Sequence, residues 1–262
     1  MCCFSGPVSE VSGTQIFARA DGTEQILVYS MNVALADDVA MVLPLPVPPG
    51  SPEKAIGWID LSGYPELFEH LNLLFPEFTL GPGLCANPVA PPPLEVFTVG
   101  SFEASFVPSP ADFARLEPRF RLSESALAAL PQYADWGFAV FKLRSDAAGG
   151  PRTIHPMAFR FPRRDPGAIF YPTVHVHDGQ FHARAVFDHH LYCLVRDPTR
   201  THQLTGWDDY YGADYHEKID LDRTQGVFDP SLELVRLTVK GELDNQDWWV
   251  PLDESEWRPG AT

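Results

Sequence analysis

Histidines gather in one short stretch of the chain. The segment YPTVHVHDGQFHARAVFDHH, residues 171–190, holds five of the nine histidines in the sequence. Neutral imidazole nitrogen is a common ligand of zinc, copper, iron and nickel. Three imidazoles with an open fourth position form a catalytic zinc site. The stretch therefore raises the hypothesis of a transition-metal site, with copper or zinc as the expected cofactor.

A turn signal inside this stretch predicts how the histidines face one another. Asp178-Gly179 is a strong two-residue hairpin signal. Counting outward places His175 opposite His182, with His177 on the same face of the two strands. Opposed side chains lie ~5 Å apart at Cβ, so three imidazoles can converge on one ion. Further ligands along the chain are expected from His189, His190, Cys2 and Cys3.

The same pattern also fits a plain solvated surface. A half-exposed antiparallel sheet needs a polar outer face, and histidine is acceptable there. Arg184 would share that face and repel a cation. No Glu follows the His-x-His pair between Asp178 and Ala183, although a cupin-like metal site would want one. The sequence leaves both interpretations open.

The start of the chain offers a second kind of chemistry. The first residues read MCCFSGPVSE, and removal of Met1 would leave Cys2 with its own α-amine. That amine can act as the base for the thiol, which is the logic of N-terminal-nucleophile hydrolases. Gly6-Pro7 interrupts the opening strand that such enzymes need. A pair of buried cysteines packed as small hydrophobic side chains is the alternative.

The C-terminal tail points to a third class of function. The segment QDWWVPLDESEW places Trp248, Trp249 and Trp257 in a short polar tail. An exposed tryptophan pair would indicate a partner or dimer surface, and a tail docked on the sheet is the other interpretation. The acid-rich stretch 206–223 fits no calcium-loop spacing. We found no glycine-rich phosphate loop, no GxSxG and no HExxH.

Composition limits the partners. The chain has 262 residues with 35 acidic and 19 basic side chains, a net charge of −16. Charge of this sign disfavours nucleic acid and anionic membrane surfaces, while a small molecule, a peptide or a second copy remains open. No apolar run reaches the length of a membrane span, and no signal peptide is recognisable. We therefore expect a cytoplasmic protein with reduced thiols.

Periodicity and turn signals predict the elements that must position these residues. DGTE at 21–24 joins two strands in a hairpin, a third strand covers 40–45, and a helix with a leucine-rich stripe covers 63–75. Strands are expected again around 94–108, 137–145, 157–161, 173–177, 181–187 and 232–239. The fold class is therefore α+β with antiparallel sheet dominating. We expect a single domain over 1–262, with two sub-halves meeting near 145–150.

The succession of segments resembles an uncharacterised bacterial domain family of unknown function. The likeness lies in PVSEVSGTQIFARADGTEQ, ADDVAMVLPLPVPP, VGSFEASFVPSPADFARL with YADWGFAVFKL, and HPMAFRFP through FYPTVHVH. Members usually look exported, so the resemblance implies that this chain is a cytoplasmic branch. The family has no established activity to carry over. His175 and His177 stand where members have apolar or small residues.

Three hypotheses follow from the sequence. The leading one is a metal-binding protein of unknown activity, a transition-metal enzyme in its strongest form, using the histidine cluster. The second is an N-terminal-nucleophile amidohydrolase using Cys2 as the catalytic residue. The third is a non-catalytic interaction module, which predicts self-association through the tail strand or the Trp248-Trp249 pair.

Overall fold

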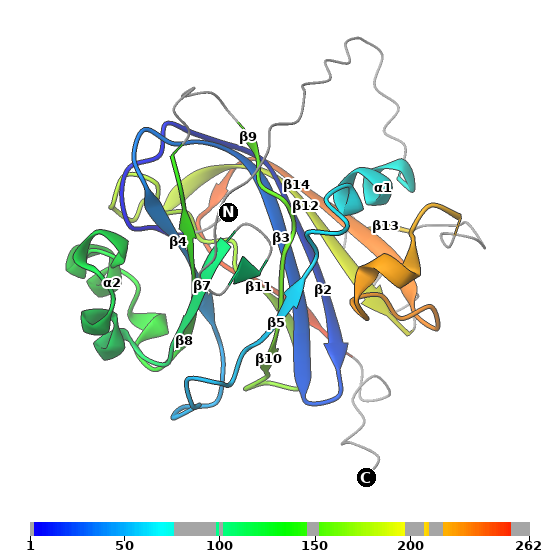
Figure 1. The fold of residues 1–262 in the computed structure, drawn as a ribbon, viewed down its shortest axis with the longest axis horizontal. Helices are drawn as coiled ribbons and strands as arrows, with labels where there is room; N and C mark the ends of the chain where they lie inside the picture. The colour runs from blue at the N-terminus through cyan, green and yellow to red at the C-terminus, as the bar shows by residue number, and fades with distance from the viewer. Residues whose placement is uncertain are drawn as a thin grey trace.

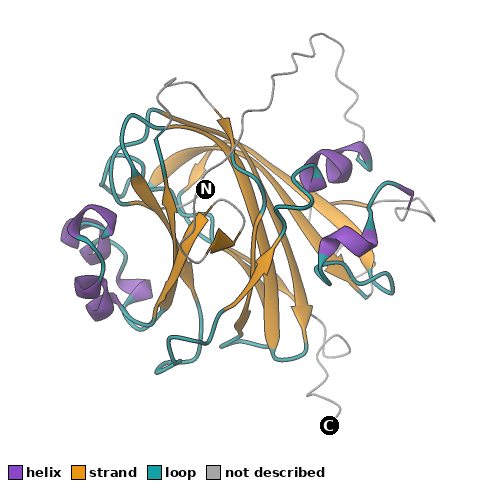
Figure 2. Ribbon diagram, in the orientation of Figure 1, coloured by secondary structure: helices purple, strands orange, loops and turns teal. Residues whose placement is uncertain are grey.

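The computed structural model shows two β-sheets that pack face to face, with short helices on their outer sides (Figures 1 and 2). The structure describes residues 3–75, 98–99, 102–145, 152–196, 207–209 and 217–252. The expected dominance of antiparallel sheet with a few short helices is confirmed. The described residues are mostly β rather than α+β. Residues 146–150, which make up most of the boundary expected near 145–150, lie outside the described ones, so the domain expectation stays a prediction.

The smaller sheet has five strands and is antiparallel. In spatial order these are β1 (Cys3–Phe4), β4 (Val39–Leu45), β8 (Gly137–Leu143), β7 (Phe102–Val107) and β6 (Thr98–Val99). Its central strands are almost wholly buried, since helices cover one face and the larger sheet covers the other. Continuous apolar runs such as VAMVL suit strands buried on both faces.

The larger sheet has eight strands. In spatial order these are β13 (Trp207–Asp209), β14 (Glu233–Asp244), β12 (Arg184–Val195), β2 (Glu10–Asp21), β3 (Glu24–Ala34), β10 (Met157–Pro162) and β5 (Gly57–Asp60), with β9 (Arg152–Thr153) on β3. Its pairs are antiparallel except β12 with β2, which run parallel. The expected hairpin at 21–24 forms, and Gly22 takes the left-handed conformation that its turn requires.

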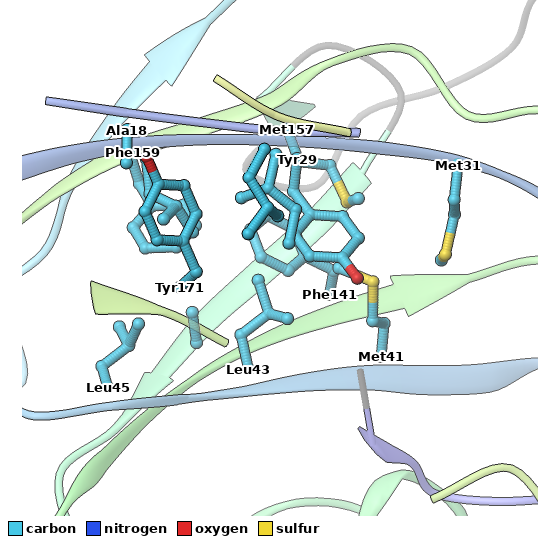
Figure 3. Packing of buried hydrophobic residues seen from close by; sticks show 14 of the residues in the cluster. Ala18, Tyr29, Met31, Met41, Leu43, Leu45, Phe141, Met157, Phe159 and Tyr171 are labelled. Carbon is cyan, nitrogen blue, oxygen red and sulfur yellow. The ribbon is translucent and has the colours of Figure 1, made fainter. Parts of the chain in front are cut away.

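The main core lies between the two sheets. Figure 3 shows Met41 and Leu43 of β4 facing Tyr29 of β3, with Phe141 and Phe159 packed beside them. These side chains alternate along their strands, so every second residue of each strand reaches this layer. The aromatic rings contact one another at angles, as in the pair Phe141–Phe159, whose centroids are 5.9 Å apart.

Two smaller cores hold the short helices. Helix α1 (Leu67–Leu73) covers the outer face of the larger sheet through Leu67, Phe68 and Leu71, members of the predicted stripe. On the outer face of the smaller sheet lie α2 and three 3₁₀ helices: η1 (Pro110–Arg115), η2 (Pro118–Phe120), α2 (Glu124–Ala128) and η3 (Pro131–Tyr133). No described helix is long and apolar enough to cross a membrane.

A two-stranded sheet completes the fold near the C-terminal end. It pairs β11 (Ala168–Tyr171) with β15 (Trp248–Pro251). The other edge of β11 is closed by one side chain. The Gln25 amide donates to the Phe170 carbonyl at 2.6 Å and accepts from the Phe170 N–H at 2.9 Å. One glutamine therefore takes the place of a neighbouring strand at this edge.

Candidate interaction site

The predicted histidine hairpin does not form. Residues 172–183 make no strand ladder, and β12 begins only at Arg184, where it pairs with β14 and β2. Val176 instead bridges to Cys3 of β1, and its carbonyl accepts from the Phe4 N–H at 3.0 Å. The expected pairing of His175 with His182 is therefore wrong, because the backbone of this segment bonds to the start of the chain.

Three imidazoles stack on one another, two from the loop 172–183 and one from β12. The rings of His175 and His177 lie 5.1 Å apart with 15° between their planes, and His175 and His189 lie 5.3 Å apart with 12°. Phe187 packs against His175 at 4.3 Å. Phe4 meets His177 edge-on at 5.7 Å. The stack thus continues the aromatic core, and His175 is only 6% exposed.

Burial keeps these imidazoles neutral. Desolvation lowers the pKa of His175 to about 2 and that of His177 to about 4, and it holds the pKa of His189 well below its usual value. The His189 Nδ1 accepts the backbone N–H of Asp188 at 3.2 Å, which places the ring proton on Nε2. Nε2 of His175 and of His177 has no hydrogen-bond partner among the described residues.

The remaining histidines point elsewhere. His182 is exposed and contacts the Asp178 carboxylate at 2.9 Å, while His190 contacts the Asn72 side chain of α1 at 3.2 Å. Within the described residues, no group of three His, Cys, Asp or Glu side chains could hold a metal ion. The prediction of a metal-binding protein built on this cluster is therefore wrong. The choice of copper or zinc as a cofactor is not tested by these contacts and stays a prediction.

Two of the four cysteines are buried, and the other two lie outside the described residues. Cys3 in β1 and Cys193 in β12 are buried thiols that form no disulfide. They pack as small hydrophobic side chains, the alternative considered from the sequence. Cys2 lies outside the described residues, as does Cys85. The nucleophile predicted at Cys2 is therefore not placed and stays a prediction.

A C-terminal strap, defined here as Asn245–Pro251, joins β14 of the larger sheet to the segment 173–183 and to η3, which covers the smaller sheet. Asn245 follows β14 directly and forms hydrogen bonds with both ends of the loop 175–183. Its amide donates to the carbonyls of His175 and His182 at 2.9 and 2.8 Å and accepts the His175 N–H at 2.7 Å. Its backbone N–H donates to Ala183 at 2.9 Å. One buried side chain thus closes a loop of eight residues, from His175 to His182.

Asp247 makes the next attachment of the strap. Its carboxylate accepts the Tyr133 hydroxyl at 2.6 Å and the N–H groups of Thr173 and Val174 at 2.9 and 3.2 Å. Withdrawal from water raises the pKa of Asp247 to about 6, although these hydrogen bonds oppose the shift. Burial and this carboxylate both raise the pKa of Tyr133.

Trp249, near the end of the strap, packs on two aromatic rings. Its ring lies 4.8 Å from Phe170 and 6.2 Å from Trp136, which it meets almost at right angles. The Arg164 guanidinium lies 6.0 Å from the Trp136 centroid and pairs with Asp135 at 2.9 Å. Trp249 is nevertheless 39% exposed. The two tryptophans of the expected pair therefore have different surroundings. Trp248 packs on the main core, whereas Trp249 presents apolar surface to solvent.

Sequence reasoning missed Asn245 and Asp247. The signal was present, because Asn245, Asp247 and Trp249 stand two residues apart and side chains alternate in an extended segment. Three alternate positions that carry an amide, a carboxylate and an indole mark a segment whose one face is fixed by specific contacts.

The chain matches no known protein family and no curated protein. The resemblance to an uncharacterised bacterial family therefore stays a prediction. Among solved structures, the chain is similar to baculovirus P35, with a TM-score of 0.50 and 12% identity over 96% of this chain and 99% of that one. A structure of the caspase-8/P35 complex has a TM-score of 0.47 and 11% identity, over 92% and 96% of the two chains. The likeness to P35 is one of fold.

Proposed function

We propose that this chain is a non-catalytic protein-binding module whose partner is a caspase. The observation that carries the proposal is the exposed Trp249 ring, held on Phe170 and Trp136 by a strap that is bonded at Asn245 and Asp247. Tryptophan and arginine are the side chains that most often dominate the binding energy of protein interfaces. Arg164 and Asp135 form an ion pair beside Trp136, one of the two rings on which Trp249 packs.

Rigid support favours this role for Trp249. Binding costs free energy when mobile side chains or loops must become ordered. The strap is fixed by one amide, one carboxylate and the β11–β15 ladder, so Trp249 is already held in place before a partner arrives. The stacked histidines are largely withdrawn from water and neutral, and we assign them to packing rather than to binding.

The choice of a caspase rests on the likeness of fold. Baculovirus P35, whose fold this chain shares across nearly its whole length, was crystallised with caspase-8. We place the binding in the cytoplasm, where the thiols of Cys3 and Cys193 stay reduced.

Binding to purified caspase-8 tests the proposal. We expect a stable complex in size-exclusion chromatography with light scattering, and slower cleavage of a peptide substrate by the caspase. Trp249→Ala should weaken the complex about tenfold or more, because loss of an interface tryptophan often costs 2 kcal/mol or more. Leu73→Ala is the matched control, since Leu73 is 65% exposed on α1. The absence of a complex, or equal effects of the two substitutions, would contradict the proposal.

A further inference from the structure

The loop 172–183 is held by the strap rather than by a strand ladder. The Asp247 carboxylate accepts two backbone N–H groups of this loop, at 2.9 and 3.2 Å. Asn245 accepts the His175 N–H at 2.7 Å and donates to the His175 carbonyl at 2.9 Å. Segments that are held by a few such contacts open more readily than strands inside a sheet. The loop and the strap are therefore expected to open as one unit, before the sheets do.

The same loop carries two of the three stacked imidazoles. The ring centroids of His177 and His175 lie 5.1 Å apart, and those of His175 and His189 of β12 lie 5.3 Å apart. Protonated rings at such distances repel one another, and burial disfavours a charge on each of them. Burial is the main reason why the pKa of all three rings is lowered. When the loop opens, His175 and His177 return to water, where an imidazole has a pKa of about 6.5.

The charged groups around the stack do not remove its preference for neutral rings. Asp178 raises the pKa of His177, and the Asp188 carboxylate lies 3.7 Å from the Nδ1 of His189. In the opposite direction, His190 lowers the pKa of His189, and the α-amino group of the chain lowers the pKa of all three stacked rings. The balance keeps the pKa of each stacked ring below its ordinary value.

The strap, η3 and β1 bring three further titratable groups to the loop. Asp247 of the strap and Tyr133 of η3 share a hydrogen bond of 2.6 Å. Burial raises the pKa of Asp247 to about 6, so the closed strap gains a proton as pH falls from about 7 towards about 4 and resists opening. Free thiols titrate at about pH 8.5, so Cys3 of β1, which pairs with Val176, does not respond in this range. Asp247 therefore offsets about one imidazole.

We propose that the loop 172–183 and the strap form an acid-sensitive latch, which opens between about pH 7 and about pH 5 while the two sheets stay folded. The latch fixes Trp249, because Asn245 and Asp247 hold the strap that contains it. When these contacts are lost, Trp249 keeps only its ring contacts and the ladder of β11 with β15. A two-stranded sheet is marginally stable by itself, so the ring loses its fixed position. Only the consequence for partner binding rests on the proposed function.

Amide hydrogen exchange at pH 7 and pH 5, corrected for the intrinsic exchange rate at each pH, measures the opening of the latch. The pKa values of the imidazoles are lower in the closed latch than in the open one, so the closed form loses stability as pH falls below about 6.5. Each of the two loop imidazoles contributes about 25-fold between these pH values, and Asp247 subtracts about tenfold. The opening constant of 172–183 and 245–251 should therefore rise about fiftyfold or more. At both pH values it should exceed that of the β2–β3 hairpin about tenfold or more.

Two histidine variants assign the pH response to the stack. His175→Phe keeps a ring in the stack but takes up no proton, so it should reduce the rise in the opening constant about tenfold or more. His155→Phe is the matched control. His155 is also withdrawn from water and has a lowered pKa, but it packs on Phe102 at 4.3 Å, outside the stack. Its substitution should leave the rise of the loop unchanged. If His175→Phe does not fold, His177→Phe makes the same test.

Each alternative result has a definite meaning. Equal opening constants for the loop and the β2–β3 hairpin would show that the loop opens only when the whole chain unfolds, and would overturn the proposal. So would an opening constant that does not change between pH 7 and pH 5, or equal effects of His175→Phe and His155→Phe.

Binding to caspase-8 tests the consequence for Trp249. Between pH 7 and pH 5 the wild-type complex should weaken more than the complex of His175→Phe, and this comparison cancels any effect of pH on the caspase itself. Equal weakening of the two complexes would overturn the link between the latch and Trp249. If caspase-8 binds at neither pH, the proposed function fails, while the exchange measurement still decides whether the latch opens.

Discussion

The interior histidines are unusual at the scale of single residues, because imidazoles rarely replace aliphatic side chains in a core. His175, His177 and His189 stack like aromatic rings and accept the loss of charge that burial imposes. Neutral imidazole retains two polar nitrogens, so the packing has a chemical cost that phenylalanine would not have. Burial also lowers the pKa of each imidazole in the folded chain, and this shift makes the stability of the chain depend on pH.

We expect stability to fall as pH drops through 6.5. The folded-state pKa values of these histidines lie below the unfolded value, so the unfolded chain takes up protons first. Between pH 7 and pH 5 the loss approaches about 2 kcal/mol for each imidazole. Asp247 acts in the opposite sense, because its raised pKa makes the folded state gain a proton as pH falls from 7 towards 4. Three imidazoles should outweigh one carboxyl.

Urea unfolding at pH 7 and pH 5 measures this loss. His175→Phe should flatten the dependence relative to wild type, because it removes one of the imidazoles whose pKa is lowered by burial. Equal unfolding midpoints at the two pH values would contradict the expectation that the pKa values of the imidazoles differ between the folded and the unfolded chain.

Asn245 is the second residue whose removal should be costly. Asn245→Ala deletes three hydrogen bonds and leaves polar backbone groups of His175 and His182 without partners. We expect a loss of about 2–4 kcal/mol in the free energy of unfolding, and faster amide exchange across 175–183. Gln180→Ala, in the exposed tip of the same loop, should change stability by less than about 0.5 kcal/mol. Similar losses from both variants would argue against the clamp.

At the scale of elements, turn signals and apolar stripes in the sequence correctly predicted the structures that depend mainly on contacts between neighbouring residues. The turn at Asp21-Gly22 formed as expected because nothing competes with β2 and β3 for each other. The apolar stripe of α1 also formed as expected, because only the apolar face of this helix can pack on the sheet. Asp178-Gly179 carries an equally strong turn signal, and Gly179 does adopt a positive φ. Its flanks do not pair, because distant residues occupy their backbones: Phe4, Val8 and Asn245.

The candidate site was harder to predict than the strands. Residue types indicated a metal, but histidines on one predicted face meet only if the predicted pairing holds. The sequence drew attention to the Trp248-Trp249 pair, but only contacts with residues far away in the sequence decide which of the two rings is exposed. The alternation of Asn245, Asp247 and Trp249 marks one face of the segment, but it does not show which distant residues that face contacts.

Gln25 gives the element-scale prediction. Its amide satisfies both backbone groups of Phe170, and Gln25→Glu would replace the donor with a buried acceptor. We expect a loss of about 2–4 kcal/mol and increased amide exchange in β11 and β15. Gln180→Glu, in an exposed turn, serves as the matched substitution. Unchanged exchange in β11 after Gln25→Glu would show that the amide is dispensable.

At the scale of the whole molecule, the proposed function rests on one surface. The strap presents Trp249 beside the helical layer of the smaller sheet. The net charge of −16 opposes self-association of the chain at low ionic strength.

The parallel pairing of β12 with β2 also constrains how the chain is made. Thr14 lies beside His189, so most of the polypeptide must leave the ribosome before β2 acquires its second neighbour. The hairpin of β2 and β3 can form early. The edge of β2 that later pairs with β12 stays unpaired while the intervening segments are synthesised. A chaperone that shields this edge during translation would act on the hairpin at the start of the chain. A transcript that ends before β12 would release a product with that edge permanently open.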